Sequence, residues 1–314
     1  MESFFIAMNA VIPFLCYMLY GYFFRRIGIT DDAFYKKLNK FIFWGLFTIM
    51  MFNNMYNMDL SMMPKLSFVL FAWGTLGGLI LLLVLIIPRI CKTKPRCSVI
   101  IQGVYRSNVL LFAVPLSESI FGSEGAALGS ILVALIVPLY NVSAAILFAC
   151  FDEKNAKPSV KDIAMKVLVN PLILGTIVGL LFLFLHIPVP KALLTPIGKF
   201  ASMASPLAIF GLGGTLYFSN IAKNLKYISF VLVMKLLLVP AVVIVLTTFM
   251  PFSGVERFLL VAIYATPIAA ASFPMAQNMG GDGELAAQLV AISTVASVVT
   301  LFLWIFVMSS TGLI

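Results

Sequence analysis

The segment from Val104 to Gly122 reads VYRSNVLLFAVPLSESIFG. It is mostly apolar, yet it holds Arg106, Asn108 and Pro115 in its interior. A proline removes one backbone donor and clashes with the carbonyl four residues earlier, so Pro115 should interrupt a helix. In hydrocarbon, interrupted backbone is tolerated only where it is buried in protein or lines a wet cavity. If this stretch crosses a membrane, it predicts a broken helix beside a cavity.

The composition of the whole chain indicates a membrane protein. Of 314 residues, 62% are hydrophobic and 11% are charged, and the mean hydropathy is +1.08. A soluble domain of this size could not bury so much apolar surface. Segments of about 20 apolar residues are long enough to cross the hydrocarbon core. Ten segments qualify: Phe4 to Phe24, Leu38 to Met58, Leu66 to Ile90, Val99 to Phe121, Ala126 to Phe151, Ile163 to Leu185, Phe200 to Phe218, Ile228 to Met250, Phe258 to Met279 and Leu285 to Met308.

The net charge of +9 is a topology signal and does not indicate nucleic acid as a partner. If the N-terminus is outside, the inner loops hold 15 basic residues and the outer loops 4. This bias follows the positive-inside rule and predicts a cytoplasmic-membrane protein with both termini outside. The loop Gly280 to Glu284 has no basic residue, so its inner position rests on the parity of the spans.

The chain also shows an internal repeat. An offset of 159 residues places the opening stretch over IYATPIAAASFPMAQNMGG, with Pro115 over Pro274. LSFVL from Leu66 in the third segment matches ISFVL from Ile228 in the eighth, at an offset of 162 residues. Each copy holds five segments, an odd number, so the second copy enters the membrane from the opposite side. We therefore predict an all-α polytopic protein of ten transmembrane helices in a 5+5 inverted repeat, with residues 1–157 as the first copy and 158–314 as the second.

Interruptions at matching positions of two inverted halves are typical of a transporter's substrate site. Pro267 adds a second break to the ninth segment. The ends of broken helices offer free N–H groups and a positive dipole to an anion. The candidate substrate-binding residues cluster around these breaks or face them from the second segment. They are Asn53, Asn54, Arg106, Asn108, Pro115, Thr266, Pro267, Ser272 and Pro274.

Charged residues inside the spans need a partner or a route to the surface. Arg106 should lie about 15 Å deep, where it either pairs with a carboxylate substrate or freed carbonyls, or reaches back to the inner surface. Lys235 lies nearer the end of its segment, so we expect it to snorkel. All 12 acidic residues fall at segment ends or in loops, which favours an anionic or neutral substrate over cation exchange. Glu118 and Asp282 are candidates for proton coupling, and uniport or sodium coupling fits equally well.

Other functional classes find less support. No spacing of cysteines with the single histidine is typical of a metal site, no phosphate-binding loop occurs, and no cofactor is expected. No Ser/Lys dyad or aspartate pair lies at a plausible depth for an intramembrane enzyme. The main alternative to a transporter is a membrane receptor that binds a small organic acid without moving it.

Two motifs carry a family resemblance that extends through the whole chain. RSNVLLFAVPLSESIFG and ATPIAAASFPMAQNMGGDGELAA resemble the fourth-span and ninth-span signatures of the auxin efflux carrier family. This family includes plant PIN-type carriers and bacterial proteins described as malate or malonate permeases. The resemblance implies broken, crossing helices 4 and 9 in an elevator fold of the bile acid symporter and PIN type. It also implies a scaffold of spans 1, 2, 6 and 7, a transport domain of spans 3–5 and 8–10, and a homodimer formed through the scaffold.

The resemblance assigns site positions to Asn108 and Pro115, to the neighbourhood of Asn53 and Asn54, and to the region of Pro267. The plant carriers space their two ninth-span prolines more closely than Pro267 and Pro274. The sequence therefore leaves open which of these two prolines marks the crossover. The substrate implied is a small organic anion.

Overall fold

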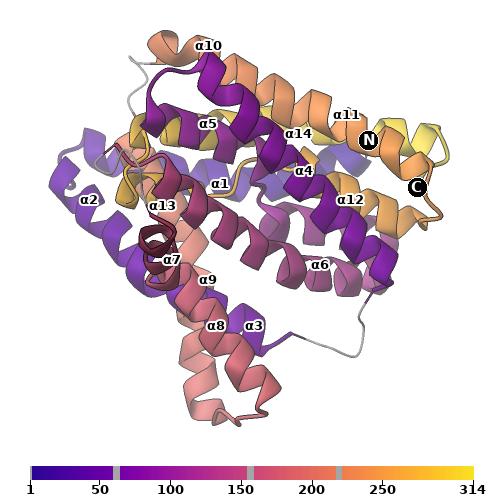
Figure 1. Ribbon diagram of the computed structural model, residues 1–314, viewed down its shortest axis with the longest axis horizontal. Helices are drawn as coiled ribbons and strands as arrows, with labels where there is room; N and C mark the ends of the chain where they lie inside the picture. The colour runs from indigo at the N-terminus through magenta and orange to yellow at the C-terminus, as the bar shows by residue number, and fades with distance from the viewer. Residues whose placement is uncertain (1, 59–63, 154–158, 217–220) are drawn as a thin grey trace.

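The protein is described by a computed structural model that covers residues 2–58, 64–153, 159–216 and 221–314 (Figure 1). In these ranges every regular element is a helix. The helices are α1 (Glu2–Arg26), α2 (Asp32–Phe41), the π-helix η1 (Ile42–Leu46), α3 (Phe47–Tyr56), α4 (Leu66–Ile90), α5 (Lys94–Tyr105), the π-helix η3 (Val109–Ala113), α6 (Val114–Cys150), α7 (Val160–Leu168), α8 (Pro171–Phe184), α9 (Lys191–Thr215), α10 (Ile221–Val233), the π-helix η5 (Met234–Leu238), α11 (Val239–Thr248), α12 (Gly254–Ala265), α13 (Ser272–Asn278) and α14 (Gly283–Ser310).

The all-helical prediction is confirmed, and each predicted segment is helical over most of its length. Among the described residues, 5 stretches are long and apolar enough to cross a membrane, or 6 if α7 and α8, bent by 66°, form one span. The ten-span inverted repeat stays a prediction. The end of the seventh segment (217–218) and the boundary between the repeats (157/158) lie outside the described residues.

A kink in α6 separates the fourth and fifth predicted segments. Gly122 has φ 66° and ψ −144° inside this long helix. A positive φ is readily adopted by glycine, which has no Cβ. The chain therefore changes direction at the boundary that the hydropathy pattern predicts between Phe121 and Ala126.

The most extensive helix contacts among the described residues are those of α1 with α9 and of α3 with α8. Glycines on α8 make the second pair possible. A Cβ at Gly175 would overlap the backbone carbonyl of Thr48, and a Cβ at Gly179 would lie 2.7 Å from the carbonyl oxygen of Phe52. Small residues let helices approach closely in lipid, where packing replaces the hydrophobic driving force.

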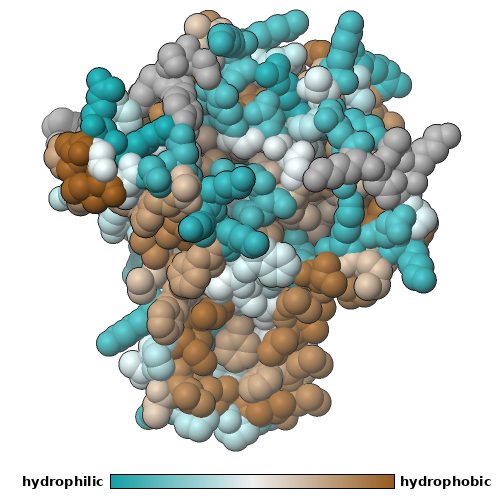
Figure 2. Space-filling model, turned by 90° about the vertical axis from the view of Figure 1, so that its left-hand side faces the viewer, coloured by the Kyte–Doolittle hydropathy of each residue, from teal (hydrophilic) through white to brown (hydrophobic). Residues whose placement is uncertain are grey.

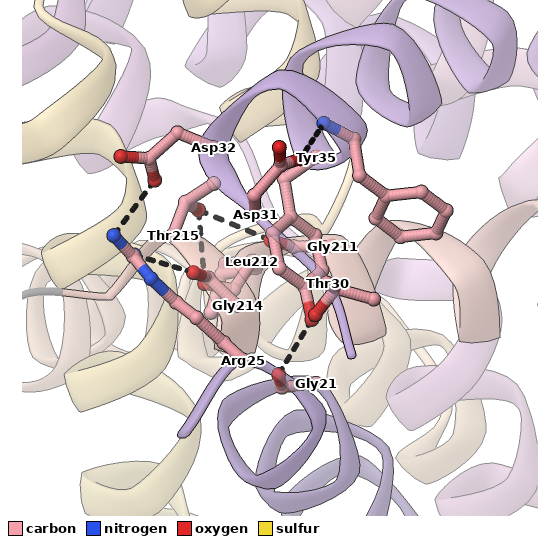
Figure 3. Close-up of polar contacts among 11 residues, drawn as sticks. Gly21, Arg25, Thr30, Asp31, Asp32, Tyr35, Gly211, Leu212, Gly214 and Thr215 are labelled. Carbon is pink, nitrogen blue, oxygen red and sulfur yellow. Dashed lines mark hydrogen bonds and ion pairs between the residues drawn. The ribbon is translucent and has the colours of Figure 1, made fainter. Parts of the chain in front are cut away.

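A polar cluster holds the turn between α1 and α2 against the end of α9 (Figure 3). Arg25 forms an ion pair of 2.7 Å with Asp32 and donates to the carbonyl of Gly214 at 2.6 Å. The buried hydroxyl of Tyr35 donates to the carbonyl of Gly21 at 2.6 Å. The bond from Arg25 satisfies a carbonyl in the last turn of α9, where the helix itself supplies no partner.

Large apolar side chains cover the surface where α8 and α9 project from the rest of the molecule (Figures 1 and 2). Figure 2 shows them gathered on the lower part of this face. The exposed ones on these two helices are Leu174, Ile177, Val178, Leu181, Phe184, Leu193, Phe200 and Met203. A surface of this kind is suited to contact with lipid chains.

The α3–α8 contact generates a prediction for stability. Gly179→Leu should lower the melting temperature of the detergent-purified protein by several degrees, because overpacking a close contact costs about 1–3 kcal/mol. Gly77→Leu on α4 is the matched control, since a Cβ there meets nothing within 4 Å. Its melting temperature should equal or exceed that of the wild type. Equal melting temperatures for the two variants would contradict the packing described for α8.

Candidate functional site

The centre of the molecule is a contact between two interrupted helices. α5 ends at Tyr105 and the helix resumes at Val109, while α12 ends at Ala265 and α13 begins at Ser272. The two gaps run antiparallel and form an isolated β-bridge between Ser107 and Ile268. The backbone N–H of Asn108 donates to the carbonyl of Pro267 at 2.8 Å. We call this contact the crossover, and Pro267 is the ninth-span proline that lies in it.

The expectation that Pro115 interrupts its helix was wrong, and of the two ninth-span prolines left open, Pro274 does not lie in the break. Pro115 is the second residue of α6, which continues the helix that resumes at Val109 in the π-helix η3, and Pro274 is the third residue of α13. Pro274 thus lies in the first turn of its helix, where its missing N–H would have no partner. The wider π turn before Pro115 gives additional room for its ring. Both breaks therefore precede these prolines.

The backbone groups freed at the ninth-span break find partners on other helices. Pro267 has no N–H to offer the carbonyl of Ile263, and the hydroxyl of Tyr140 donates to that carbonyl at 3.1 Å. The N–H of Ile268 donates to the hydroxyl oxygen of Ser293 on α14 at 3.2 Å. The break is thus stabilised by side chains from α6 and α14, as buried backbone polar groups require.

Lys235 donates to a third backbone group that the breaks leave without a partner. The prediction that its side chain snorkels to the membrane surface was wrong. The side chain is 0% exposed and its Nζ donates to the carbonyl of Tyr264 at 3.2 Å. Nζ also donates to the hydroxyl of Ser107 across the crossover. The lysine stays inside because the two breaks supply oxygen acceptors there. Only its position within an apolar segment could have indicated this role from the sequence.

Arg106 is buried at the crossover. The alternative that its side chain reaches back to the inner surface of the membrane is therefore wrong. It is 3% exposed, its Nη2 donates to Oδ1 of Asn141 at 2.7 Å, and its Nη1 lies 3.1 Å from Sδ of Met275. Its Nε has no hydrogen-bond partner. Among the described residues, Arg106 contacts no carboxylate, so its positive charge has no protein counterion there.

A small cavity of ≈ 50 Å³ adjoins the crossover. Its wall combines both breaks with α3, α6 and α9, and the polar residues in it are Asn54, Arg106, Ser107, Asn108, Tyr140 and Ser205. Asn54, Leu110 and Ser205 also line a larger cavity of ≈ 710 Å³, to which Asn53 and Pro115 belong. In the described part of the chain, no aspartate or glutamate lines either cavity.

The other three predicted ninth-span residues, Thr266, Ser272 and Pro274, have different surroundings. Thr266 is fully buried and its hydroxyl donates to the carbonyl of Ala262 at 2.9 Å, so it completes the last turn of α12. Pro274 is buried within α13 and lines neither cavity. Ser272 is buried with a hydroxyl that has no hydrogen-bond partner. Of these three residues, only Ser272 retains free hydrogen-bonding capacity.

Neither of the two candidate coupling acids lines the two cavities. Glu118 is exposed. Asp282 caps α14 by accepting from the N–H of Leu285 at 3.0 Å, and it forms an ion pair of 2.9 Å with Arg96. Asp282 therefore joins the start of α14 to the start of α5.

Three features of the site were missed from the sequence: the donors Tyr140 and Lys235 and the Arg106 partner Asn141. All three come from helices other than the broken ones. A tyrosine or asparagine in an apolar helix is common as an interhelical hydrogen-bonding residue, so neither stands out. Their roles depend on which helices surround the crossover.

Comparison with known proteins shows which family this chain resembles. Residues 6–305 match the family described as "Membrane transport protein". An "Uncharacterized transporter" of Methanothermobacter thermautotrophicus is 24% identical over 302 residues, which is 94% of this chain and 96% of that protein. A "Putative malonate transporter" of Rhizobium meliloti is 24% identical over 299 residues and 92% of each chain.

The family match covers nearly the whole chain and confirms the resemblance to the auxin efflux carriers. Both named relatives are transporters, and the helices are apolar and numerous enough for repeated membrane crossing. The chain therefore belongs to the membrane transport protein family and is a multi-pass membrane protein.

Proposed function

We propose that this protein is a secondary transporter of a small organic anion, with a short dicarboxylate such as malonate as the preferred substrate. The observation that carries the proposal is the uncompensated charge of Arg106 in the wall of a cavity without acidic lining in the described residues. A buried charge is strongly destabilising unless it is paired. An anionic substrate would supply the missing counterion.

The groups around Arg106 suit a carboxylate. Asn108 lines the same cavity, and a side-chain amide can donate hydrogen bonds to carboxylate oxygens. Asn54 and Ser205 add further donors from α3 and α9. Hydrogen bonds between such donors and an ionised carboxylate are stronger than neutral ones.

The cavity volume favours a short substrate. The cavity at the crossover has ≈ 50 Å³, well below the roughly 300–1,000 Å³ of pockets for drug-sized ligands. The larger cavity of ≈ 710 Å³ shares its lining with the small one and provides an approach to it. The malonate in the name of the Rhizobium relative agrees with a substrate of this size.

The position of the cavity supports alternating access by an elevator motion. Asn54 and Ser205 belong to α3 and α9, helices of the predicted scaffold, whereas Asn108 belongs to the predicted transport domain. The scaffold helices pack in the pairs α1–α9 and α3–α8. Sliding of one group against the other would expose the crossover alternately to each side of the cytoplasmic membrane. The scaffold would also form the homodimer.

Reconstituted protein tests the function directly. Proteoliposomes should take up radiolabelled malonate with saturable kinetics, and unlabelled dicarboxylates should compete. Binding of malonate without any flux would favour the receptor alternative, and the absence of both would contradict the proposal.

Asn108→Ala should reduce malonate uptake at subsaturating concentration by about tenfold or more. A hydrogen bond to a charged group contributes about 1.5–3 kcal/mol, and about 1.4 kcal/mol corresponds to a factor of ten. Asn278→Ala is the control, because Asn278 is the last residue of α13 and its side chain donates to the carbonyl of Pro274. Uptake by the Asn108 variant at the control level would remove Asn108 from the site.

Arg106→Gln should weaken the binding of malonate more than that of its monoanionic half-amide, malonamate. The guanidinium is expected to pair with the second carboxylate, so its loss removes a charge interaction that malonamate does not make. Isothermal titration calorimetry in nanodiscs measures both affinities, with the exposed Arg89 changed to glutamine as control. Equal weakening for both ligands would show that Arg106 does not select a dianion.

A further inference from the structure

We propose that the ammonium group of Lys235 acts as a built-in monovalent cation at the crossover. The wild-type protein then needs no bound sodium or potassium ion at this point, and removal of the side chain opens a site for a free monovalent cation. This inference concerns the stability of the crossover and does not depend on the substrate.

The position of Nζ resembles that of a coordinated ion. It lies between the carbonyl of Tyr264 at the end of α12 and the hydroxyl of Ser107 in the fourth-span break. Both acceptors are neutral oxygens, and they come from the two different broken helices. Freed carbonyls at half-helix C-terminal ends are the groups that coordinate monovalent cations in discontinuous membrane helices. The negative end of the α12 dipole adds to the attraction.

The carbonyl of Tyr264 depends on this contact. In an unbroken helix it would accept from the N–H of Ile268, but that N–H donates to Ser293. An unsatisfied backbone carbonyl in hydrocarbon is destabilising by several kcal/mol. Lys235 therefore closes a gap in hydrogen bonding that the break creates, and it does so from η5, which belongs to neither broken helix.

The positive charge of Lys235 leaves no place for a second cation at the crossover. Lys235 is 0% exposed, and in the described residues no carboxylate is paired with it. Arg106 precedes Ser107 in the chain and is also buried, so a free sodium ion would meet two positive charges here. Like charges in a medium of low dielectric constant repel strongly. The crossover is thus already occupied by a tethered cation.

The test compares the melting temperatures of purified variants without substrate at constant ionic strength. The salts are choline, sodium, potassium and methylammonium chloride. Lys235→Ala should melt several degrees below the wild type in choline, and at least one of the three smaller cations should restore most of the loss. Lys235→Met should be destabilised but not restored, because its side chain fills the space. The wild type and Lys226→Ala, an exposed lysine on α10, should respond equally little to all four salts.

Two results would overturn the proposal: a Lys235→Ala protein whose melting temperature is the same in all four salts, or a wild type that is stabilised by sodium relative to choline. If Lys235→Ala cannot be purified in choline, it should be recovered as a monodisperse protein in one of the smaller cations; failure in all four salts would also count against it. Because no substrate is present, a negative result in this test does not affect the proposed transport of anions. A failure to detect transport likewise does not affect the proposed role of Lys235.

Discussion

The structure depends on one constraint, which is that backbone polar groups in hydrocarbon must be hydrogen-bonded. Two helices break this rule within themselves and satisfy it through each other, by the N–H of Asn108 and the carbonyl of Pro267. The groups that remain are satisfied by Tyr140, Lys235 and Ser293 from three further helices. The crossover is therefore held from several sides, and the irregular backbone is kept at the wall of a cavity.

This arrangement concentrates positive charge without protein counterions in the described part of the chain. Lys235 serves the backbone of the crossover, whereas Arg106 lines the cavity with one guanidinium nitrogen unpartnered. The two cations thus have different surroundings: one contacts the backbone of the breaks, and the other lies at the cavity where we propose that an anion binds. The absence of acidic lining in both described cavities gives the site a single sign of charge, which favours anions of higher charge.

The sequence allowed the helical class, the position of most helices, the family and the existence of paired breaks to be predicted, because hydropathy and proline act locally. It placed the fourth-span break at Pro115, although the helix that resumes at Val109 accommodates this proline after a π turn, and it left open whether Pro267 or Pro274 marks the ninth-span break. It also assigned Lys235 to the surface. Both errors have one origin, because the location of a break and the fate of a buried charge depend on acceptors supplied by other helices. Asn54 and Asn108, by contrast, were predicted as site residues and do line the same cavity.

We propose that the crossover and Arg106 together form the binding site for an anion. An experimental structure of the protein in lipid nanodiscs with saturating malonate would test this proposal. We expect density for a dicarboxylate in the cavity between Asn54 and Asn108, with one carboxylate within hydrogen-bonding distance of Arg106. Continuous helices through residues 106–108 and 266–271, or malonate bound elsewhere with the cavity empty, would contradict it.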